Sequence, residues 1–418
     1  MKVLLATDAF PPVSGGSGWS TYELARGLRA RGHDVLVVRP RPGHRAAIWR
    51  ADYDGFEVVE VGAPAPPVPY LRNYFKNERL YARLADVLAD IIGRDRIEVV
   101  HGQHVLTCVP SIEAAHRRGI PAVCTIRDYW PVCYWSDLIH TRAEGALCPG
   151  CSAGMMTRCI RPRAGAAWPA AVPMIPYMRR NLRTKREGLA RADAVIAVSS
   201  TIAADLRARA PEIPADRIHV IPNPVDIAGL QARQPLAARP LAEPYVLYVG
   251  KLAPNKGTAR LVEVLDRAAV SWPAVVVGDG PDRSRLEVAA RRSARDVRFT
   301  GWQDQTSVMS WLAHATVLLF PSRGPESLSR VLIEASALGV PIAAMCTGGT
   351  ADIVEHGVTG LLSQTADGLA DDLRRLADDP SLRLRLGAAA RERAWRFDAA
   401  GVVERIEGLY AAVRRRAA

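Results

Sequence analysis

The sequence predicts an α/β protein made of two doubly wound domains that face each other across a cleft. Three observations lead to this prediction. With 418 residues, the chain is too long for one ordinary hydrophobic core. Short apolar runs of strand length alternate with stretches of helix length, which is typical of parallel sheets covered by helices. This alternation begins twice, at Lys2–Thr7 and again at Tyr245–Gly250.

The first domain opens with a strand–turn–helix–strand unit. The apolar run Lys2–Thr7 is followed by a glycine-rich turn, Asp8–Trp19. Ser20–Arg31 has the spacing of an amphipathic helix, and Asp34–Val38 is the next strand. The turn reads GGSG rather than GxGxxG, and Arg39 stands where a dinucleotide-binding strand usually ends in an acidic residue. The unit therefore predicts a Rossmann-like fold but disfavours a nicotinamide cofactor.

The domain boundaries follow from changes in composition along the chain. We assign residues 1–222 to an N-terminal Rossmann-like domain and residues 245–394 to a C-terminal one. Residues 223–244, rich in alanine and proline, separate them as a linker. Residues 395–418 form a basic helix that we expect to pack back on the N-terminal domain.

The charge and hydropathy of the chain narrow its partners. The formal net charge is +12, which fits an acidic substrate or an anionic surface. The basic residues are scattered without a recognition-helix motif, so we expect no nucleic acid partner. No apolar run reaches membrane-spanning length, and Met1–Leu5 begins a strand rather than a signal peptide. We therefore expect a cytoplasmic protein.

One stretch leaves a membrane role open. Trp168–Arg186 places aromatic and apolar residues directly before a dense basic run. Such a segment can rest on the anionic inner face of a membrane, which would make the protein a peripheral one. The alternative is a core helix with a solvated basic end.

Four cysteines fall close together in an irregular part of the first domain. They follow the spacing Cys-x14-Cys-x2-Cys-x7-Cys, and they are Cys133, Cys148, Cys151 and Cys159. Four thiols that include one CxxC pair predict a structural zinc or another metal. Disulfide or redox pairing and unligated thiols are the alternatives.

The most informative stretch of the second domain is Thr316–Ala343. It reads as strand, polar loop, helix and strand, with the helix at Arg330–Leu338. A loop that leaves a parallel strand and opens a helix is an anion site, because free N–H groups point into it. Glu326 and Glu334 would repel a phosphate there, so we expect them to accept hydrogen bonds from ribose or sugar hydroxyls. This combination indicates a nucleotide-activated sugar, with two solvated glutamates as the alternative.

Other candidate residues also lie at the carboxyl ends of predicted strands. Lys251 and Lys256 follow Tyr245–Gly250 and suit a diphosphate. In the first domain, His104 and Asp128 each follow a predicted strand. Side chains at such strand ends converge on one cleft. A single histidine there is nevertheless more often structural than catalytic.

Five motifs occur in a fixed order along the chain. They are GGSG from Gly15, GKLAPNKG from Gly250, ESLSRVLIE from Glu326, GGTADIV from Gly348 and GVTGLL from Gly357. Together they resemble the retaining nucleotide-sugar glycosyltransferases of family 4, which have the two-domain GT-B architecture. The resemblance covers essentially the whole chain and implies that the C-terminal domain binds the donor and the N-terminal domain the acceptor.

The resemblance also implies roles for individual residues. Lys251 and Lys256 would hold the donor diphosphate, Glu334 the ribose hydroxyls and Glu326 the donor sugar. Further donor contacts would come from backbone groups and the helix start, at Gly15, Gly16, Leu328, Ser329 and Arg330. His104 and Asp128 would face the acceptor, with His101 as an alternative to His104.

The sequence departs from the family pattern at several of these positions. Lys251 stands where arginine is usual, and lysine offers a point charge without bidentate geometry. Ser327 and Ser329 replace frequent glycine or proline, and Asp352 replaces a frequent glutamate. Arg127 replaces the histidine that commonly precedes Asp128. Among these departures, Arg127 is the one that most alters the chemistry expected at the acceptor site.

We therefore expect an enzyme that moves a hexosyl group from a nucleotide-diphosphate sugar to a saccharide or lipid-linked saccharide, as in polysaccharide biosynthesis. No Asp-x-Asp motif lies near a strand end, so we expect metal-independent catalysis that requires no cofactor. The leaving phosphate is the expected base for the acceptor hydroxyl. The alternatives are a GT-B-shaped sugar-nucleotide epimerase, a dinucleotide oxidoreductase and a non-catalytic GT-B scaffold.

Overall fold

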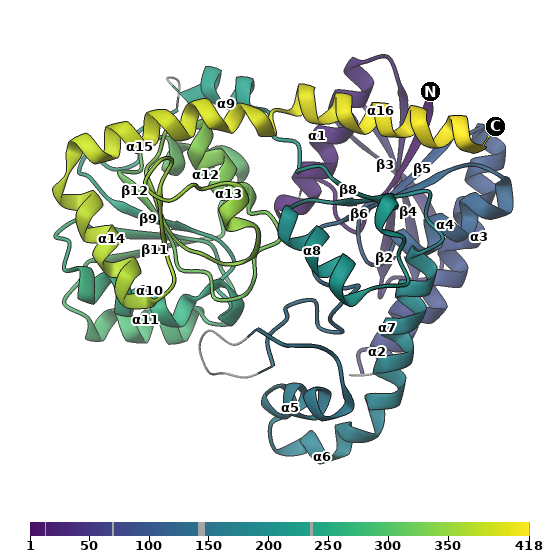
Figure 1. Ribbon diagram of the computed structural model, residues 1–418, viewed down its shortest axis with the longest axis horizontal. Helices are drawn as coiled ribbons and strands as arrows, with labels where there is room; N and C mark the ends of the chain where they lie inside the picture. Colours follow the sequence, from purple (N-terminus) through teal and green to yellow (C-terminus); the bar gives the residue numbers. More distant parts are fainter. Residues whose placement is uncertain (13, 69–70, 141–146, 235–236, 418) are drawn as a thin grey trace. The chain divides into compact units, whose positions relative to one another are not determined.

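Figure 1 shows the computed structural model of the chain, which describes residues 1–12, 14–68, 71–140, 147–234 and 237–417. The chain divides into two compact units. Unit 1 comprises Met1–Ser136, Cys148–Pro224 and Ala399–Ala418, and unit 2 comprises Asp137–Leu147 and Val225–Asp398. Each unit is built around one sheet, and each is described by itself below.

The sheet of unit 1 has the strand order β3-β4-β2-β1-β5-β6-β7-β8. Its strands are β1 (Lys2–Ala6), β2 (Asp34–Pro42), β3 (Ile48–Tyr53), β4 (Phe56–Ala63), β5 (Val99–Gly102), β6 (Ala122–Ile126), β7 (Ala194–Ala197) and β8 (Ile218–Val220). All neighbours pair in parallel except β3 and β4. Strand β3 was not predicted, because it is an exposed edge strand without an apolar face. The left-handed pair Asp54–Gly55 that turns β3 into β4 was the available signal.

Helices cover both faces of this sheet. They are α1 (Gly16–Ala30), α2 (Leu71–Tyr74), α3 (Leu80–Asp95), α4 (Cys108–Arg118), α5 (Ala153–Ala164), α6 (Trp168–Ala171), α7 (Ile175–Leu189), α8 (Ser200–Arg209) and α16 (Ala399–Ala417). One face packs against α1 and α16 through a shared hydrophobic core. Helices α3 and α4 pack against each other and α4 against β5 and β6, with α7 beside α4.

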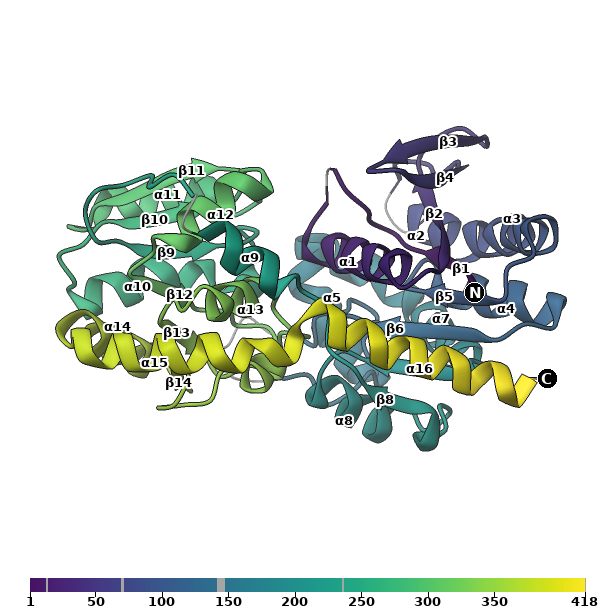
Figure 2. The same ribbon diagram turned by 90° about the horizontal axis from the view of Figure 1, so that it is seen from above.

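The last helix of the chain, α16, belongs to unit 1 and runs along α1 (Figure 2). Gly27 permits the close approach, since a Cβ there would lie 2.6 Å from Cγ2 of Val403. At the other end, the buried Tyr410 hydroxyl bonds Nδ1 of His101 at 2.6 Å. These contacts explain why the C-terminal residues leave unit 2 and complete the core of unit 1.

The sheet of unit 2 is wholly parallel, with the order β11-β10-β9-β12-β13-β14. Its strands are β9 (Val246–Val249), β10 (Ala274–Val277), β11 (Val297–Gly301), β12 (Val317–Phe320), β13 (Ile342–Met345) and β14 (Leu361–Ser363). Its helices are α9 (Ile227–Arg233), α10 (Thr258–Ala268), α11 (Arg283–Arg292), α12 (Gln305–Ala313), α13 (Arg330–Ala337), α14 (Ala366–Asp378) and α15 (Pro380–Arg393).

Successive side chains along each strand of unit 2 point to opposite faces of the sheet, and a layer of helices covers each face. Val246 and Tyr248 on β9, and Val317 and Leu319 on β12, join the core formed with α10, α11 and α14. The intervening residues face the opposite layer, where α12 lies against β9 and α13 against β13. The two parallel α/β halves predicted from the alternating pattern are therefore confirmed.

The segment predicted as a linker, residues 223–244, is more than a connection. It contains α9, which lies in unit 2. The amide of Gln231 donates to the carbonyl of Ala337 at 3.1 Å, and that of Gln234 to the carbonyl of Leu338 at 3.0 Å. These are terminal carbonyls of α13, which otherwise lack intrahelical partners. A structured α9 therefore caps the helix that carries Glu334.

A membrane-spanning helix would have to be both long and apolar. Among the residues that the structure describes, no helix meets these two conditions.

Candidate functional site

Three loops of unit 2 meet around the segment that follows β12. The backbone carbonyl of Asn255 accepts from the N–H groups of Arg323 and Gly324, at 3.0 and 2.8 Å. Gly257 has a φ of +70°, and a Cβ there would lie 1.8 Å from the carbonyl oxygen of Pro321. Only glycine fits at this position, so the GKLAPNKG turn packs directly on the loop that carries Glu326.

The Glu326 side chain lies at the centre of this arrangement. Its carboxylate is nearly buried and accepts from Nζ of Lys256 at 2.8 and 2.9 Å. The Ser322 hydroxyl donates to Oε1 of the same carboxylate at 2.5 Å. The ion pair fixes the positions of both predicted residues before any ligand binds. The sequence-predicted residues Lys256 and Glu326, 70 positions apart, are thus brought together.

The Gly-Gly-Thr turn holds the backbone of Glu326 in place. Gly349 donates its N–H to the carbonyl of Glu326 at 2.7 Å. Gly348 has a φ of +52°, and a Cβ there would lie 2.2 Å from that carbonyl. Close backbone approach and positive φ therefore require glycine at position 348.

Helix α13 positions the second carboxylate. Oε1 of the buried Glu334 accepts from Nε of Arg330 at 2.7 Å and from Nε2 of Gln305 at 3.3 Å. The N–H groups of Leu328 and Ser329, directly before the helix, donate to no group that the structure describes. They remain available to an anion at a helix N-terminus, as the sequence predicts.

Lys251 differs from Lys256 in its surroundings. It follows β9 directly and is exposed, and its ammonium group bonds none of the described residues. Lys256, by contrast, is held by Glu326. The two predicted phosphate-binding lysines therefore lie at the same strand end, one fixed by an ion pair and one not.

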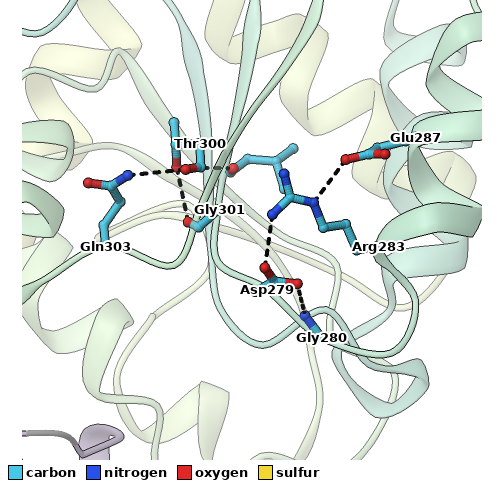
Figure 3. Close-up of polar contacts among 8 residues, drawn as sticks. Asp279, Gly280, Arg283, Glu287, Thr300, Gly301 and Gln303 are labelled. Carbon is cyan, nitrogen blue, oxygen red and sulfur yellow. Dashed lines mark hydrogen bonds and ion pairs between the residues drawn. The ribbon is translucent and has the colours of Figure 1, made fainter.

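The neighbouring strand ends of unit 2 carry a second set of polar contacts (Figure 3). Arg283 on α11 donates to Oδ2 of Asp279 and to Oε1 of Glu287, both at 2.9 Å. After β11, the amide of Gln303 donates to the carbonyl of Thr300 at 3.1 Å. These bonds fix the loops after β10 and β11 at the same edge of the sheet as Lys251.

In unit 1, polar side chains follow three adjacent strands. Asp8 comes after β1, His104 after β5 and Asp128 after β6. Burial raises the pKa of the Asp8 carboxyl to about 7 and that of the Asp128 carboxyl to about 6, and the charge of Asp128 adds to the shift at Asp8. The Asp8 N–H donates to Nδ1 of His104 at 3.3 Å. These side chains therefore share one polar region.

The two candidate histidines have different environments. His101 is fully buried, and both of its ring nitrogens are bonded, to Tyr410 and Thr125. It is a structural residue of the core rather than an alternative to His104. Nδ1 of His104 accepts the N–H of Asp8, so the neutral ring carries its hydrogen on Nε2. This Nε2 is buried and bonds no described group. Burial also lowers the pKa of both rings well below the usual range.

Two further cations lie near these residues. Arg127 is buried and donates to Oδ1 of Asn223 at 2.9 Å and to the carbonyl of Gln103 at 3.0 Å. Its side chain is thus held within the fold. Lys185 on α7 is 6% exposed, and burial lowers its pKa to about 8 despite the nearby charge of Asp128. We call Asp8, His104, Asp128 and Lys185 the unit 1 polar cluster.

The glycine-rich turn of unit 1 has the predicted position. Gly15 is the N-cap of α1 and Gly16 is its first residue, and both are exposed. A Cβ on Gly15 would meet nothing within 4 Å, whereas one on Gly18 would lie 1.9 Å from the Ser14 hydroxyl. Within unit 1, close packing therefore requires Gly18, and the predicted donor contacts of Gly15 and Gly16 stay a prediction.

The structure does not support the predicted metal site at the four cysteines. Sγ of Cys159 accepts from Arg163, one turn further along α5, at 2.9 Å, and Sγ of Cys148 donates to the carbonyl of Gly150. A hydrogen bond with Cys133, together with burial, raises the pKa of Cys151 far above its usual value. Among the described residues, no three histidines, cysteines or acidic residues are grouped so that they could hold a metal ion.

Sequence reasoning missed three residues that contact the predicted ones, Asp8, Gln305 and Ser322, and one on which the charge of Asp128 acts, Lys185. Asp8 follows β1 directly, so the strand-end rule that selected Asp128 could also have selected it. Ser322 and Gln305 lie in polar loops whose partners are distant in sequence. Lys185 lies inside a helix rich in basic residues, where no local signal distinguishes it from its neighbours.

Comparison with known proteins identifies the family. The family described as Glycosyltransferase Family 4 matches residues 14–228, and Glycosyl transferases group 1 matches residues 235–393. A D-inositol 3-phosphate glycosyltransferase of Xylanimonas cellulosilytica is 30% identical, over 92% of this chain and 88% of its own. The chain belongs to glycosyltransferase family 4. A glycogen synthase of Mycobacterium tuberculosis is 29% identical to this family 4 enzyme, over 94% of this chain and 90% of its own.

A solved structure supports the fold of this family 4 glycosyltransferase. Anabaena HepE, in complex with UDP-glucose, superposes with a TM-score of 0.69 at 20% sequence identity. The likeness covers 99% of this chain and 100% of HepE. It confirms the predicted GT-B architecture of two Rossmann-like domains.

Proposed function

We propose that the protein is a retaining, metal-independent glycosyltransferase that moves a hexosyl group from a nucleotide-diphosphate sugar to a hydroxyl of a saccharide or lipid-linked saccharide. The observation that carries this proposal is the convergence of three loops on Glu326. Lys256 and Ser322 bond its carboxylate, and the Gly348–Gly349 turn holds its backbone. The relative HepE has been solved with UDP-glucose, which supports a nucleotide sugar as the donor.

The charges of unit 2 suit the departure of a diphosphate. When the glycosidic bond breaks, negative charge develops on the leaving phosphate oxygen. Lys256 and Lys251 supply positive charge at the strand end, and the N–H groups of Leu328 and Ser329 add donors at the start of α13. Charges fixed before the reaction stabilise this transition state without reorganisation. Glu334 would accept hydrogen bonds from the ribose hydroxyls, and Glu326 from the donor sugar.

Acceptor activation in this proposal uses the donor itself. The acceptor hydroxyl loses its proton to the departing phosphate, which becomes more basic as the bond breaks. Asp128 and His104 orient the acceptor in unit 1. The lysines take the part that a divalent cation plays in other transferases, so activity is expected to persist in EDTA.

A donor screen tests the proposal. UDP-, GDP- and ADP-linked hexoses are compared by thermal shift, and the best donor is then incubated with saccharide acceptors. We expect stabilisation by at least one nucleotide sugar and a product whose anomeric configuration, read by NMR, matches the donor. A donor converted to its epimer without an acceptor would favour an epimerase. Stabilisation by none of the three classes would refute the donor site.

We also propose that the protein associates peripherally with an anionic membrane. In the stretch Trp168–Arg186, Ile175 and Met178 pack inward with Met156 and Ile160, so its apolar face is not free. Six exposed side chains of α5 and α7 are basic: Arg158, Arg161, Arg163, Arg179, Arg180 and Arg183. Each basic residue near an anionic surface contributes about 1 kcal/mol of attraction at low salt. Attraction by charge rather than insertion therefore supports this association.

Vesicle flotation tests the membrane proposal. We expect binding to vesicles that contain phosphatidylglycerol, little binding to pure phosphatidylcholine, and release as the salt concentration rises. Exchanging Arg179, Arg180 and Arg183 for glutamine is expected to weaken binding. Equal binding to both vesicle types would exclude the electrostatic attachment.

A further inference from the structure

Lys185 is a buried cation of unit 1 whose side chain is 6% exposed. No hydrogen bond or ion pair reaches its ammonium group from the part of the chain that the structure describes. Nζ lies over the ring of Tyr134, 6.0 Å from the centroid, in a cation–π contact that brings no counter-charge. Asp128 acts on Lys185 through its charge but makes no ion pair with it within 4.0 Å. Burial of an unpaired ammonium is costly, so a fold rarely keeps one without a function.

The other members of the unit 1 polar cluster also have unused hydrogen-bonding capacity. Oδ1 of Asp8 is buried and bonds no described group, while Oδ2 accepts the N–H of Leu106 at 3.3 Å. Nε2 of His104 is a buried donor without a partner in the described residues. The Asp8 carboxyl can accept a hydrogen bond, and the His104 imidazole can donate one. A hydroxyl group both donates and accepts hydrogen bonds, so it matches this pair of side chains. Asp8 and His104 are therefore suited to the hydroxyl groups of a sugar or cyclitol.

A hydroxyl does not meet the needs of Lys185. A hydroxyl would accept one hydrogen bond from the ammonium group but would bring no counter-charge into the buried position. An anionic group would supply both the hydrogen-bond acceptor and the counter-charge. The helices around Lys185 favour such a group, because residues 148–186 contain no aspartate or glutamate and many arginines. The positive field of α5 and α7 would attract an anion towards the cluster.

We propose that Lys185 binds an anionic group, phosphate or carboxylate, on the acceptor, whose hydroxyls bond Asp8 and His104. The acceptor is then an anionic hexose or cyclitol, either free or as the headgroup of a lipid. This inference rests on the proposed glycosyl transfer and deepens it by naming the acceptor class. Asp8 and Asp128 oppose an anion at close range, while Lys76, whose charge acts on Asp8, and Lys185 favour it. The anionic group is therefore placed at Lys185 and away from the two carboxyls.

Groups of ligands that share one ring and differ in charge test the proposal. Calorimetry in saturating UDP compares glucose with glucose 6-phosphate, glucuronate and glucosamine, and myo-inositol with its 1-phosphate. We expect each anionic member to bind about tenfold or more tightly than its neutral parent, as one new ion pair in a buried site allows. Vesicles that contain phosphatidylinositol form a separate arm, which distinguishes a lipid headgroup from a free phosphate.

Variants assign the preference to one residue. Lys185→Gln is expected to bring the ratio of anionic to neutral affinity close to one, whereas Arg207→Gln, an exposed control on α8, keeps it. A preference for glucose or glucosamine, no preference at all, or a preference that survives Lys185→Gln would overturn the proposal. Binding of the nucleoside diphosphate selected by the donor screen is measured in every variant. Failure of the unaltered protein to bind UDP, GDP or ADP would instead refute the donor site in unit 2.

Discussion

In unit 2, the Glu326 carboxylate lies between the Lys256 ammonium and the Ser322 hydroxyl, whereas in unit 1 the buried Lys185 ammonium bonds none of the described residues. Both sites lie at the carboxyl edge of a parallel sheet, so fold position alone does not explain the difference. In unit 2 the charges are already fixed, as stabilisation of a leaving group requires. In unit 1 they remain unpaired, as recognition of a ligand with its own charge requires.

The contrast shows how a family 4 enzyme can keep one half constant and vary the other. The donor motifs hold one another through backbone contacts in which only glycine fits, at Gly257 and Gly348. A substitution in one of these loops therefore displaces the others. The unit 1 polar cluster consists of side chains that follow separate strands or lie on a helix, and they contact neighbouring loops through single hydrogen bonds, such as that from the N–H of Leu106 to Asp8. Four substitutions test this contrast, from the largest expected effect to the smallest.

Removal of the fixed charge in unit 2 is expected to have the largest effect. Lys256→Ala leaves the buried Glu326 carboxylate with Ser322 and removes a cation from the leaving group. We expect kcat to fall about 10²–10³-fold, as for other preorganised transition-state donors. Steady-state kinetics with the best donor measure it. Arg298→Ala, which removes an exposed ion pair with Asp296, serves as the control and should leave kcat unchanged. Unchanged activity in Lys256→Ala would make the donor assignment wrong.

The glycine contacts of unit 2 allow a matched pair of substitutions. Gly348 and Gly357 both have positive φ, but a Cβ at Gly348 would lie 2.2 Å from the Glu326 carbonyl and one at Gly357 would meet nothing within 4 Å. Gly357→Ala should cost about 1 kcal/mol of stability, from backbone strain alone. Gly348→Ala should cost roughly 1–3 kcal/mol more and weaken donor binding, because the Glu326 backbone must move. Urea unfolding and calorimetry with UDP compare the two. Equal costs would show that the Gly348 turn does not hold Glu326.

The unpaired lysine of unit 1 is expected to lower stability. Burial lowers its folded-state pKa from 10.5 to about 8, so the charged form costs roughly 1–3 kcal/mol below pH 8. Lys185→Met should therefore stabilise the protein at pH 7, in contrast to Lys256→Ala. As pH rises from 8 to 10.5, the folded state releases its proton before the unfolded state does, and the advantage of methionine should disappear. Urea unfolding at pH 7 and pH 10 checks this. A destabilised Lys185→Met would mean that the lysine has a structural partner.

The smallest effect is expected at Asp8, because the N–H of Leu106 bonds its carboxyl and offsets part of the cost of burial. Its pKa is raised from 3.8 to about 7, mainly by burial. Between these values the unfolded carboxyl is ionised while the folded one still holds its proton, so the unaltered protein should lose stability as pH rises from 4 to 7. Asp8→Asn should lose less over the same range. Urea unfolding at pH 5 and pH 8 measures how much the free energy of unfolding changes with pH in the unaltered protein and in Asp8→Asn. Asp54→Asn is an exposed control. Parallel pH profiles for the unaltered protein and Asp8→Asn would refute the raised pKa.

Local sequence pattern was sufficient for most of the parallel strands of both sheets. Alternating apolar runs indicated these strands, and the glycine motifs indicated turns that the structure places against neighbouring backbone. Local pattern was insufficient for β3, which has no apolar face, and for α9, which lies in a segment whose composition resembles a linker. For the four cysteines, spacing left metal binding, pairing and unligated thiols open, and it does not show that Sγ of Cys159 accepts from Arg163.

By itself, the sequence determined the α/β class, the two-domain organisation and the motifs that carry Lys251, Lys256, Glu326 and Glu334. These follow from short-range periodicity and from residue types that the chain keeps close together. Only the tertiary structure decided which polar groups are bonded and which are not. It separated the structural His101 from His104, paired Lys256 with Glu326, and left Lys185 buried without a partner in the described residues. The reason is physical: burial and pairing depend on residues distant in sequence, and no local pattern encodes the distance between them.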